Sequence, residues 1–181
     1  MSVLFAVSAA AQPPPDFSGR WQLVPDPSGT TGSARSAPSM GSGWGSDISI
    51  VQDATTLTIE FTPYVRYDIQ PPTRLVYRLD GTESTNTINV GRGPQDQIST
   101  AAWNGATLTL TTVRTFSPGR GDKPTKIRTT QTLALESPPA VSGAERPALS
   151  GVGGTRLVVE TTHGGALSGA PSTSRSIYTK N

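Results

Sequence analysis

The fold is decided by the stretch Trp103-Asn-Gly-Ala-Thr-Leu-Thr-Leu110. Asn104 and Gly105 both tolerate the positive φ of a tight type I′ turn, so this dipeptide predicts a β-hairpin. After the turn, Leu108 and Leu110 alternate with threonines, whose branched Cβ suits a pleated strand and crowds a helix. This period of two puts the leucines on a buried face of the sheet and the threonines on a wet face.

The same alternation recurs between Gly- and Pro-containing turns along most of the chain, and no helical periodicity is visible. We expect strands at 17–24, 47–52, 56–62, 73–80, 83–90, 97–103, 107–116, 126–136, 156–162 and 174–180. Short connections between them predict an all-β antiparallel up-and-down meander. Closure into a barrel of about eight to ten strands would remove the edge strands. An open sandwich is the alternative.

Composition favours one domain with long loops. Of 181 residues, 34% are hydrophobic and 15% charged, against averages of about 45–50% and about 25%. Two Gly/Pro/Ser-rich inserts, at about 25–46 and 137–154, have too little apolar surface to offset their ordering entropy. We therefore expect flexible loops there, with Trp44 as the one large apolar side chain of the first insert.

The N-terminus predicts export. Residues 3–7 are apolar, and Ala9-Ala10-Ala11 has the small residues of a signal-peptidase site, although a basic n-region is missing. We expect residues 1–11 to be the remnant of a signal peptide and 12–181 to be a single domain, periplasmic or secreted. An ordinary apolar arm is the alternative. No apolar run reaches the roughly 20 residues that a membrane-spanning helix needs.

Several kinds of chemistry are excluded or disfavoured. The chain has no Cys and only His163, which excludes disulfides, thiolate zinc sites and multi-His metal sites. A formal charge of +2 is too slight to indicate a nucleic-acid binder. No Gly-x-Ser-x-Gly elbow is present, and His163 beside two glycines is expected to be a solvated loop residue. We therefore expect no catalytic residue, metal or cofactor, while an enzyme on the same fold stays open.

A family resemblance rests on Asp16-Phe-Ser-Gly-Arg-Trp21, which is similar to the Gly-x-Trp signature on the first strand of lipocalins and related calycin barrels. Together with the later turn motifs and the Tyr-x-Lys ending, it resembles exported bacterial lipocalin-like proteins over most of residues 16–181, apart from the inserts. In that family a basic residue of the last strand packs over the Trp. The resemblance implies that Gly19, Trp21 and Arg175 form a structural latch at the base of the barrel.

Inward-facing rings predict the ligand site. Barrels of this size hold one small ligand in an apolar cavity with few polar groups. The candidate ligand-binding residues are Phe61, Tyr77, Trp103, Phe116 and Gln131, with the Tyr77 hydroxyl and the Gln131 amide as polar handles. We expect a small apolar or amphipathic ligand. If the rings fill the core instead, the protein is a structural or interaction module that meets a macromolecular partner through its loops.

Overall fold

The sheet accounts for every regular element that the structure, a computed structural model, describes. The structure describes residues 13–25, 42–63, 71–89, 93–116, 123–137, 154–165 and 171–181. Within these ranges there are β-strands and no helix. The strands are β1 (Gly19–Leu23), β2 (Asp47–Gln52), β3 (Thr56–Phe61), β4 (Thr73–Arg78), β5 (Ser84–Asn89), β6 (Pro94–Asn104), β7 (Thr107–Phe116), β8 (Thr125–Glu136), β9 (Arg156–Gly165) and β10 (Ser172–Lys180).

The strands form one antiparallel sheet in the order β4-β3-β2-β1-β10-β9-β8-β7-β6-β5. Strands that are consecutive in the chain are neighbours in the sheet except β4 and β5, which stand at its two ends, and β1 pairs with β10. The sheet curls so that β4 and β5 approach each other. The predicted all-β up-and-down meander is therefore confirmed, as a nearly closed barrel.

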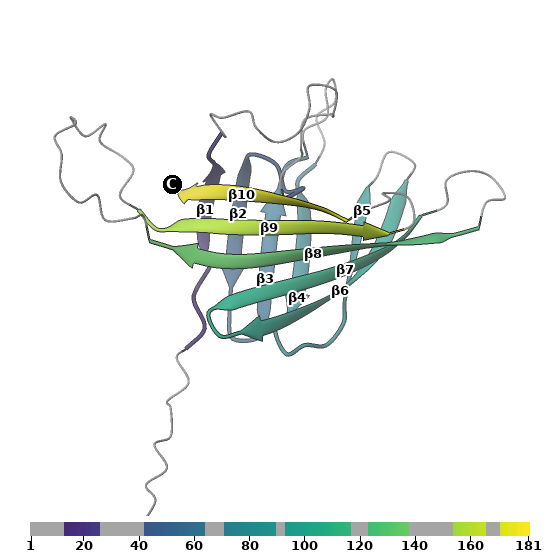
Figure 1. The fold of residues 1–181 in the computed structure, drawn as a ribbon, viewed down its shortest axis with the longest axis horizontal. Helices are drawn as coiled ribbons and strands as arrows, with labels where there is room; N and C mark the ends of the chain where they lie inside the picture. Colours follow the sequence, from purple (N-terminus) through teal and green to yellow (C-terminus); the bar gives the residue numbers. More distant parts are fainter. Residues whose placement is uncertain are drawn as a thin grey trace, which may run out of the picture.

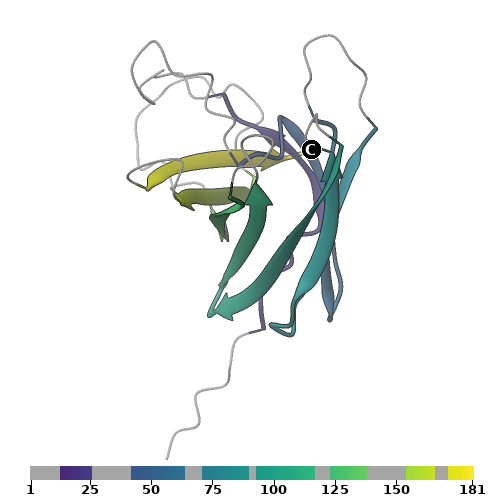
Figure 2. The ribbon, with the colours of Figure 1, turned by 90° about the vertical axis from the view of Figure 1, so that its right-hand side faces the viewer.

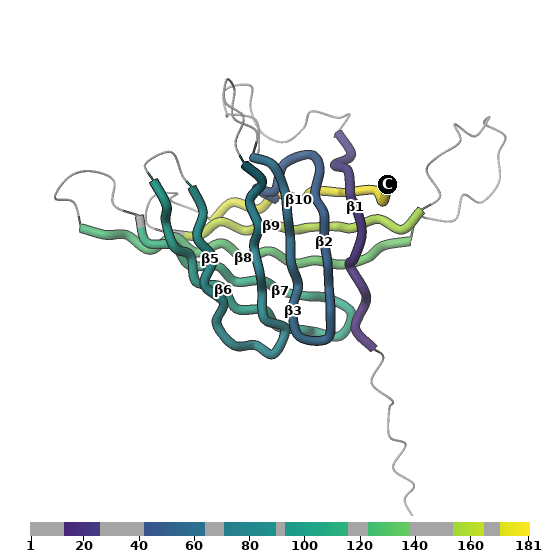
Figure 3. Tube along the Cα trace, turned by 180° about the vertical axis from the view of Figure 1, so that it is seen from behind, coloured from purple at the N-terminus to yellow at the C-terminus, as the bar shows by residue number. Residues whose placement is uncertain are grey.

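The barrel is flattened, and its two halves cross. Figure 1 shows β8, β9 and β10 running horizontally across the view. Behind them, β1 to β4 run nearly vertically, so the two groups of strands cross. The view turned by 90° shows the curl of the sheet (Figure 2). From behind, β5 and β6 lie beside β4, the strand next to β3 (Figure 3). The inner faces of the two halves therefore meet, and apolar side chains from both fill the space between them.

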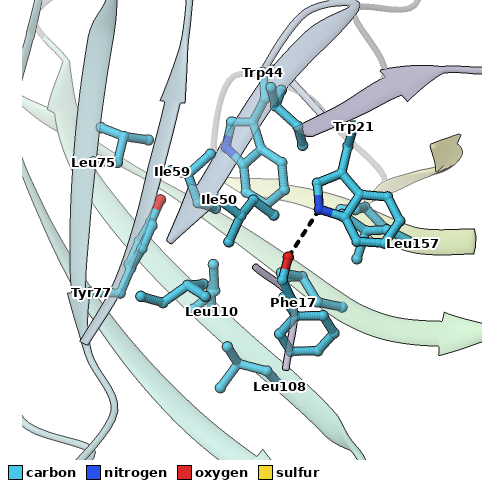
Figure 4. Packing of buried hydrophobic residues seen from close by; sticks show 14 of the residues in the cluster. Phe17, Trp21, Trp44, Ile50, Ile59, Leu75, Tyr77, Leu108, Leu110 and Leu157 are labelled. Atoms are coloured by element: carbon cyan, nitrogen blue, oxygen red, sulfur yellow. Dashed lines mark hydrogen bonds between the residues drawn. The ribbon is translucent and has the colours of Figure 1, made fainter. Parts of the chain in front are cut away.

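The core follows from the period-two alternation, since the antiparallel register brings inward positions opposite one another. Trp21 pairs with Ile48 on β2, and Leu108 pairs with Leu133 on β8. Rings and aliphatic side chains from both halves pack together (Figure 4). The buried cluster contains Phe17, Trp21, Trp44, Ile48, Ile50, Leu57, Ile59, Leu75, Tyr77, Ala101, Leu108, Leu110, Leu133, Leu157, Val159 and Tyr178.

Two local expectations need correction. Asn104 pairs with Thr107, so the hairpin turn is centred on Gly105 and Ala106, one residue later than predicted. Gly105 supplies the positive φ, at +58°. The first insert is also shorter than predicted, because residues 42–46 pack into the barrel and Trp44 is only 3% exposed. An indole ring carries enough apolar surface to hold a short polar segment in place.

Other sequence-based expectations lie outside the described residues. The structure does not describe residues 1–12, most of the first insert (26–41) or most of the second (138–153). In the part of the chain that it does describe, no helix is long and apolar enough to cross a membrane.

Candidate functional site

One end of the barrel is closed by aromatic rings. The Trp21 Nε1–H donates to the carbonyl oxygen of Phe17 at 2.9 Å (Figure 4). The Phe17 ring stacks on Trp103, with centroids 5.9 Å apart and planes 4° from parallel. The Trp103 ring therefore packs at this closed end of the barrel, away from the cavity described below.

The cation over Trp21 is Lys180, so the implied role of Arg175 is wrong. Lys180 lies opposite Trp21 in the register of β1 and β10, and its Nζ lies 5.5 Å from the centroid of the indole. Arg175 is an odd number of residues earlier on the same strand and so points to the other face. There it forms an exposed ion pair with Glu136 at 2.9 Å.

Gly19 makes room for this cation. Its φ is +147°, which side-chain-bearing residues rarely adopt, and a Cβ at this position would lie 2.5 Å from Cε of Lys180. The glycine of the Gly-x-Trp motif thus lets the lysine stem cross the first strand and reach the indole face.

The interior becomes polar toward the other end of the barrel. Ser99 Oγ and Thr112 Oγ1 form a buried hydrogen bond of 2.9 Å between β6 and β7. Further buried polar side chains on β5 to β10 are Ser84, Asn86, Gln97, Gln131, Thr161 and Ser176. So many buried polar groups are unusual for a core whose only task is packing, because each needs a partner in place of water.

This polar end contains a cavity of about 150 Å³. One wall is apolar and comes from β3, β4, β5 and the 42–46 segment. The opposite wall is polar and comes from β6 to β9. The apolar lining consists of Trp44, Phe61, Leu75, Tyr77 and Ile88, and the polar lining of Gln97, Thr112, Arg114, Thr129, Gln131 and His163, with Ser42 and Gly43 between them.

The 42–46 segment forms the roof of the cavity. The Gln131 amide donates to the carbonyl of Ser42 at 2.6 Å. The hydroxyls of Ser42 and Tyr178 are 2.6 Å apart, and Tyr178 donates to the carbonyl of Gly45 at 3.0 Å. Burial raises the pKa of the Tyr178 phenol, and the hydrogen bond from Ser42 opposes this only in part. Tyr178 is therefore a neutral donor at physiological pH.

Three polar groups of the lining lack a partner within the part of the chain that the structure describes. Among the described residues, none forms a hydrogen bond or ion pair with the Tyr77 hydroxyl, the Gln97 amide or the Arg114 guanidinium. Tyr77 is 1% exposed and Gln97 5% exposed. Burial raises the pKa of Tyr77, which keeps its hydroxyl neutral and able to donate. Unpaired groups in such a position are available to a ligand or to water.

His163 is better placed than expected. It lies within β9 and not in a solvated loop, it lines the cavity, and its Nδ1 is 3.2 Å from Thr129 Oγ1. No carboxylate contacts it among the described residues, so the arrangement of a hydroxyl nucleophile, a base and an orienting acid is not present there. The described residues also contain no group of three or more side chains that would hold a metal ion.

The structure brings together three of the five predicted ligand-binding residues. Phe61, Tyr77 and Gln131 line the same cavity. Trp103 lies about 20 Å along β6 from Gln97, at roughly 3.3 Å per residue. The side chain of Phe116, at the end of β7, is outside the described part of the chain.

Three important members of the site were not anticipated from the sequence: Trp44, Gln97 and Arg114. Arg114 and Gln97 continue the inward rows of Leu108-Leu110 and Ala101-Ser99, so the period-two alternation that predicts the leucines would also have placed them inside. Trp44 gave no such signal, because no alternation surrounds it.

Comparison with known proteins gives no relative: no family model, no curated protein and no solved structure matches this chain.

Proposed function

We propose that this protein binds one small amphipathic molecule in the cavity at the polar end of its barrel, without catalysis. The observation that carries the proposal is the division of a single cavity into an apolar wall and a wall whose Gln97 and Arg114 side chains have no partner among the described residues. A core that only packs would pair or exclude such groups, since an unsatisfied buried donor costs about 1–3 kcal/mol.

The cavity volume limits the ligand. An apolar cavity of about 150 Å³ holds a molecule of the size of benzene, whereas drug-sized ligands occupy about 300–1,000 Å³. We therefore propose a ligand whose buried body is one small ring or a branched aliphatic group. Beyond the cavity, the core side chains of the described residues pack against one another, so we take the size of the ligand from the cavity itself.

Kinship with lipocalins and export from the cell are part of the same proposal. The meander barrel and the Gly19, Trp21 and Lys180 arrangement support a lipocalin-like protein. The apolar stretch and small residues of 1–11 support a periplasmic or secreted location.

Titration with toluene, benzyl alcohol and benzoate, followed by two-dimensional NMR of the indole N–H groups, tests the proposal. Trp44 lines the cavity and Trp103 lies at the other end, so bound probes should shift the Trp44 signal and leave that of Trp103 in place. Assignment uses Trp44→Phe and Trp103→Phe. If no probe shifts Trp44 at millimolar concentration, the ligand-binding proposal is wrong and the interaction module takes its place.

A further inference from the structure

We infer that the ligand is an anion, a small aromatic or branched aliphatic carboxylate, and that Arg114 and Gln97 bind its carboxylate group. This inference rests on the proposed function and adds the chemical class of the ligand.

The described residues that line the cavity include a positive charge and no negative charge. Among the described lining residues, Arg114 is the only permanently charged side chain, and none is Asp or Glu. Of the acids in the described ranges, Asp96 beside Gln97 and Glu160 near His163 lie on the outer face of the barrel: Asp96 is exposed and accepts a hydrogen bond from Thr87 at 2.6 Å, and Glu160 is exposed on β9. No protein carboxylate of the described residues therefore neutralises the Arg114 guanidinium.

Arg114 and Gln97 are placed to act together. They are directly opposite each other in the register of β7 and β6, and residues so paired have Cβ atoms about 4.5–5.5 Å apart on one face. Guanidinium and amide N–H groups at that separation reach the two oxygens of one carboxylate. The planar fork of arginine matches a carboxylate in a bidentate manner.

An anion satisfies this wall better than a neutral ligand. A partly buried guanidinium without a counter-ion is unfavourable, and hydrogen bonds to charged groups contribute more than neutral ones. A neutral alcohol would offer one weak acceptor and leave most of the five Arg N–H donors unpaired.

The opposite wall fixes the other end of the ligand. Trp44, Phe61, Leu75 and Ile88 face the polar strands across the cavity. The Tyr77 hydroxyl points toward the side of the core where Leu75 and Trp44 lie (Figure 4), and it remains an additional neutral donor within the cavity. A ring or branched chain held against these side chains therefore directs its carboxylate toward β6 and β7.

The test compares benzoate with benzyl alcohol, which have similar bodies and differ in charge. Binding is measured by calorimetry and by the Trp44 indole shift, on the full chain. The wild type should bind benzoate at least about tenfold more tightly than benzyl alcohol. Arg114→Gln should weaken benzoate binding far more than benzyl alcohol binding and so remove this preference. Arg128→Gln is the matched control, because Arg128 is exposed on the neighbouring strand β8, on the outer face, and it should keep the preference.

The outcomes separate the two proposals. If neither probe binds, the proposed function fails. If the wild type binds both equally, or if Arg114→Gln keeps the benzoate preference, ligand binding stands and the anion inference is overturned. Should Arg114→Gln not fold, Gln97→Leu replaces it, with the same expected selective loss of benzoate. An equal loss of both probes in that variant would contradict the inference.

Discussion

Asn86 on β5 pairs with the backbone of Val76 on β4 as a neighbouring strand would. Its Oδ1 accepts the Val76 N–H at 2.7 Å, and its Nδ2 donates to the Val76 carbonyl at 2.9 Å. Two residues away, Ser84 Oγ accepts the N–H of Arg78 at 2.8 Å. These side chains close the barrel where the backbone ladder is interrupted, and they satisfy edge groups that would otherwise be exposed.

Replacement of Asn86 should weaken the contact between β4 and β5. Asn86→Ala leaves both backbone groups of Val76 without a partner in a partly buried place, so the free energy of unfolding should fall by about 1–3 kcal/mol. Urea unfolding followed by circular dichroism measures the change. Thr85→Ala, at an exposed neighbouring position on β5, is the control and should change stability by less than about 0.5 kcal/mol.

The pH dependence of the stability of Asn86→Asp tests the two hydrogen bonds between this side chain and the backbone of Val76. A carboxylate keeps the acceptor for Val76 N–H but places a second oxygen against the Val76 carbonyl. Only the protonated form donates there, so the folded state should raise the pKa of the new carboxyl. The hydrogen bond from the protonated carboxyl to the Val76 carbonyl then stabilises the folded state below the unfolded pKa of about 3.9, and this stabilisation is lost as pH rises through the folded pKa. The variant should be closer to wild type at acid pH than at neutral pH, and an equal deficit at both would argue against the pairing.

The Gly19 and Lys180 contact predicts strong coupling between these residues. Gly19→Ala is strained by its positive φ and also displaces the lysine stem, so it should destabilise the protein by more than about 1 kcal/mol. Lys180→Ala should cost about 0.5–1 kcal/mol through the lost contact with the Trp21 ring. In a double-mutant cycle, Lys180→Ala should have almost no further effect once Ala replaces Gly19. Full additivity of the two losses would show that the contact carries no energy.

Gln131 should hold the roof of the cavity in place. Gln131→Leu keeps the volume but leaves the Ser42 carbonyl without its donor, so stability should fall by about 1–3 kcal/mol. Release of the 42–46 segment should also move Trp44 toward water and shift its emission to the red. The comparison uses Trp21→Phe and Trp103→Phe backgrounds to isolate the signal of Trp44. Unchanged emission together with unchanged stability would mean that Gln131 does not anchor the segment.

Most of the sheet could be predicted because its physical signal is local. Leu57, Ile59, Leu108 and Leu110 alternate with threonines, and that pattern specifies both the strand and its buried face. Turn residues such as Gly81 and Gly105, which have positive φ, mark the strand ends. The position of the turn at Gly105 differs by one residue from the expectation. This shift leaves the inward and outward alternation of the flanking residues unchanged, so the alternation could not reveal it.

Contacts between distant strands could not be predicted in the same way. The choice of Lys180 over Arg175 depends on the register of β10 against β1, which the family resemblance does not specify. Burial of Trp44 depends on hydrogen bonds from Gln131 and Tyr178 to a segment with no alternation of its own. The polar wall is not predicted by residue type, because Gln97 and Arg114 look like solvated residues until the barrel closes around them.

Asp53 should make the β2–β3 hairpin sensitive to acid. Its carboxylate accepts the N–H groups of Thr55 and Thr56, each at 2.7 Å, and both of their hydroxyls, at 2.9 and 2.7 Å. These bonds, with the Thr55 N–H first, lower the pKa of Asp53. Because the folded pKa lies below the unfolded value of about 3.9, the stabilisation is complete above that pH and is lost as pH falls below it.

Asp53→Ala should therefore have a lower Tm than the wild type at pH 7 and by the same amount at pH 5, and the two curves should converge below about pH 4. Asp53→Asn keeps one neutral acceptor for the two N–H groups, so it should lie between them and add no pH dependence of its own. Thermal unfolding from pH 7 to pH 2.5 measures all three proteins. A Tm difference between Asp53→Ala and wild type that persists unchanged to the lowest pH would show that the carboxylate charge does not stabilise this turn.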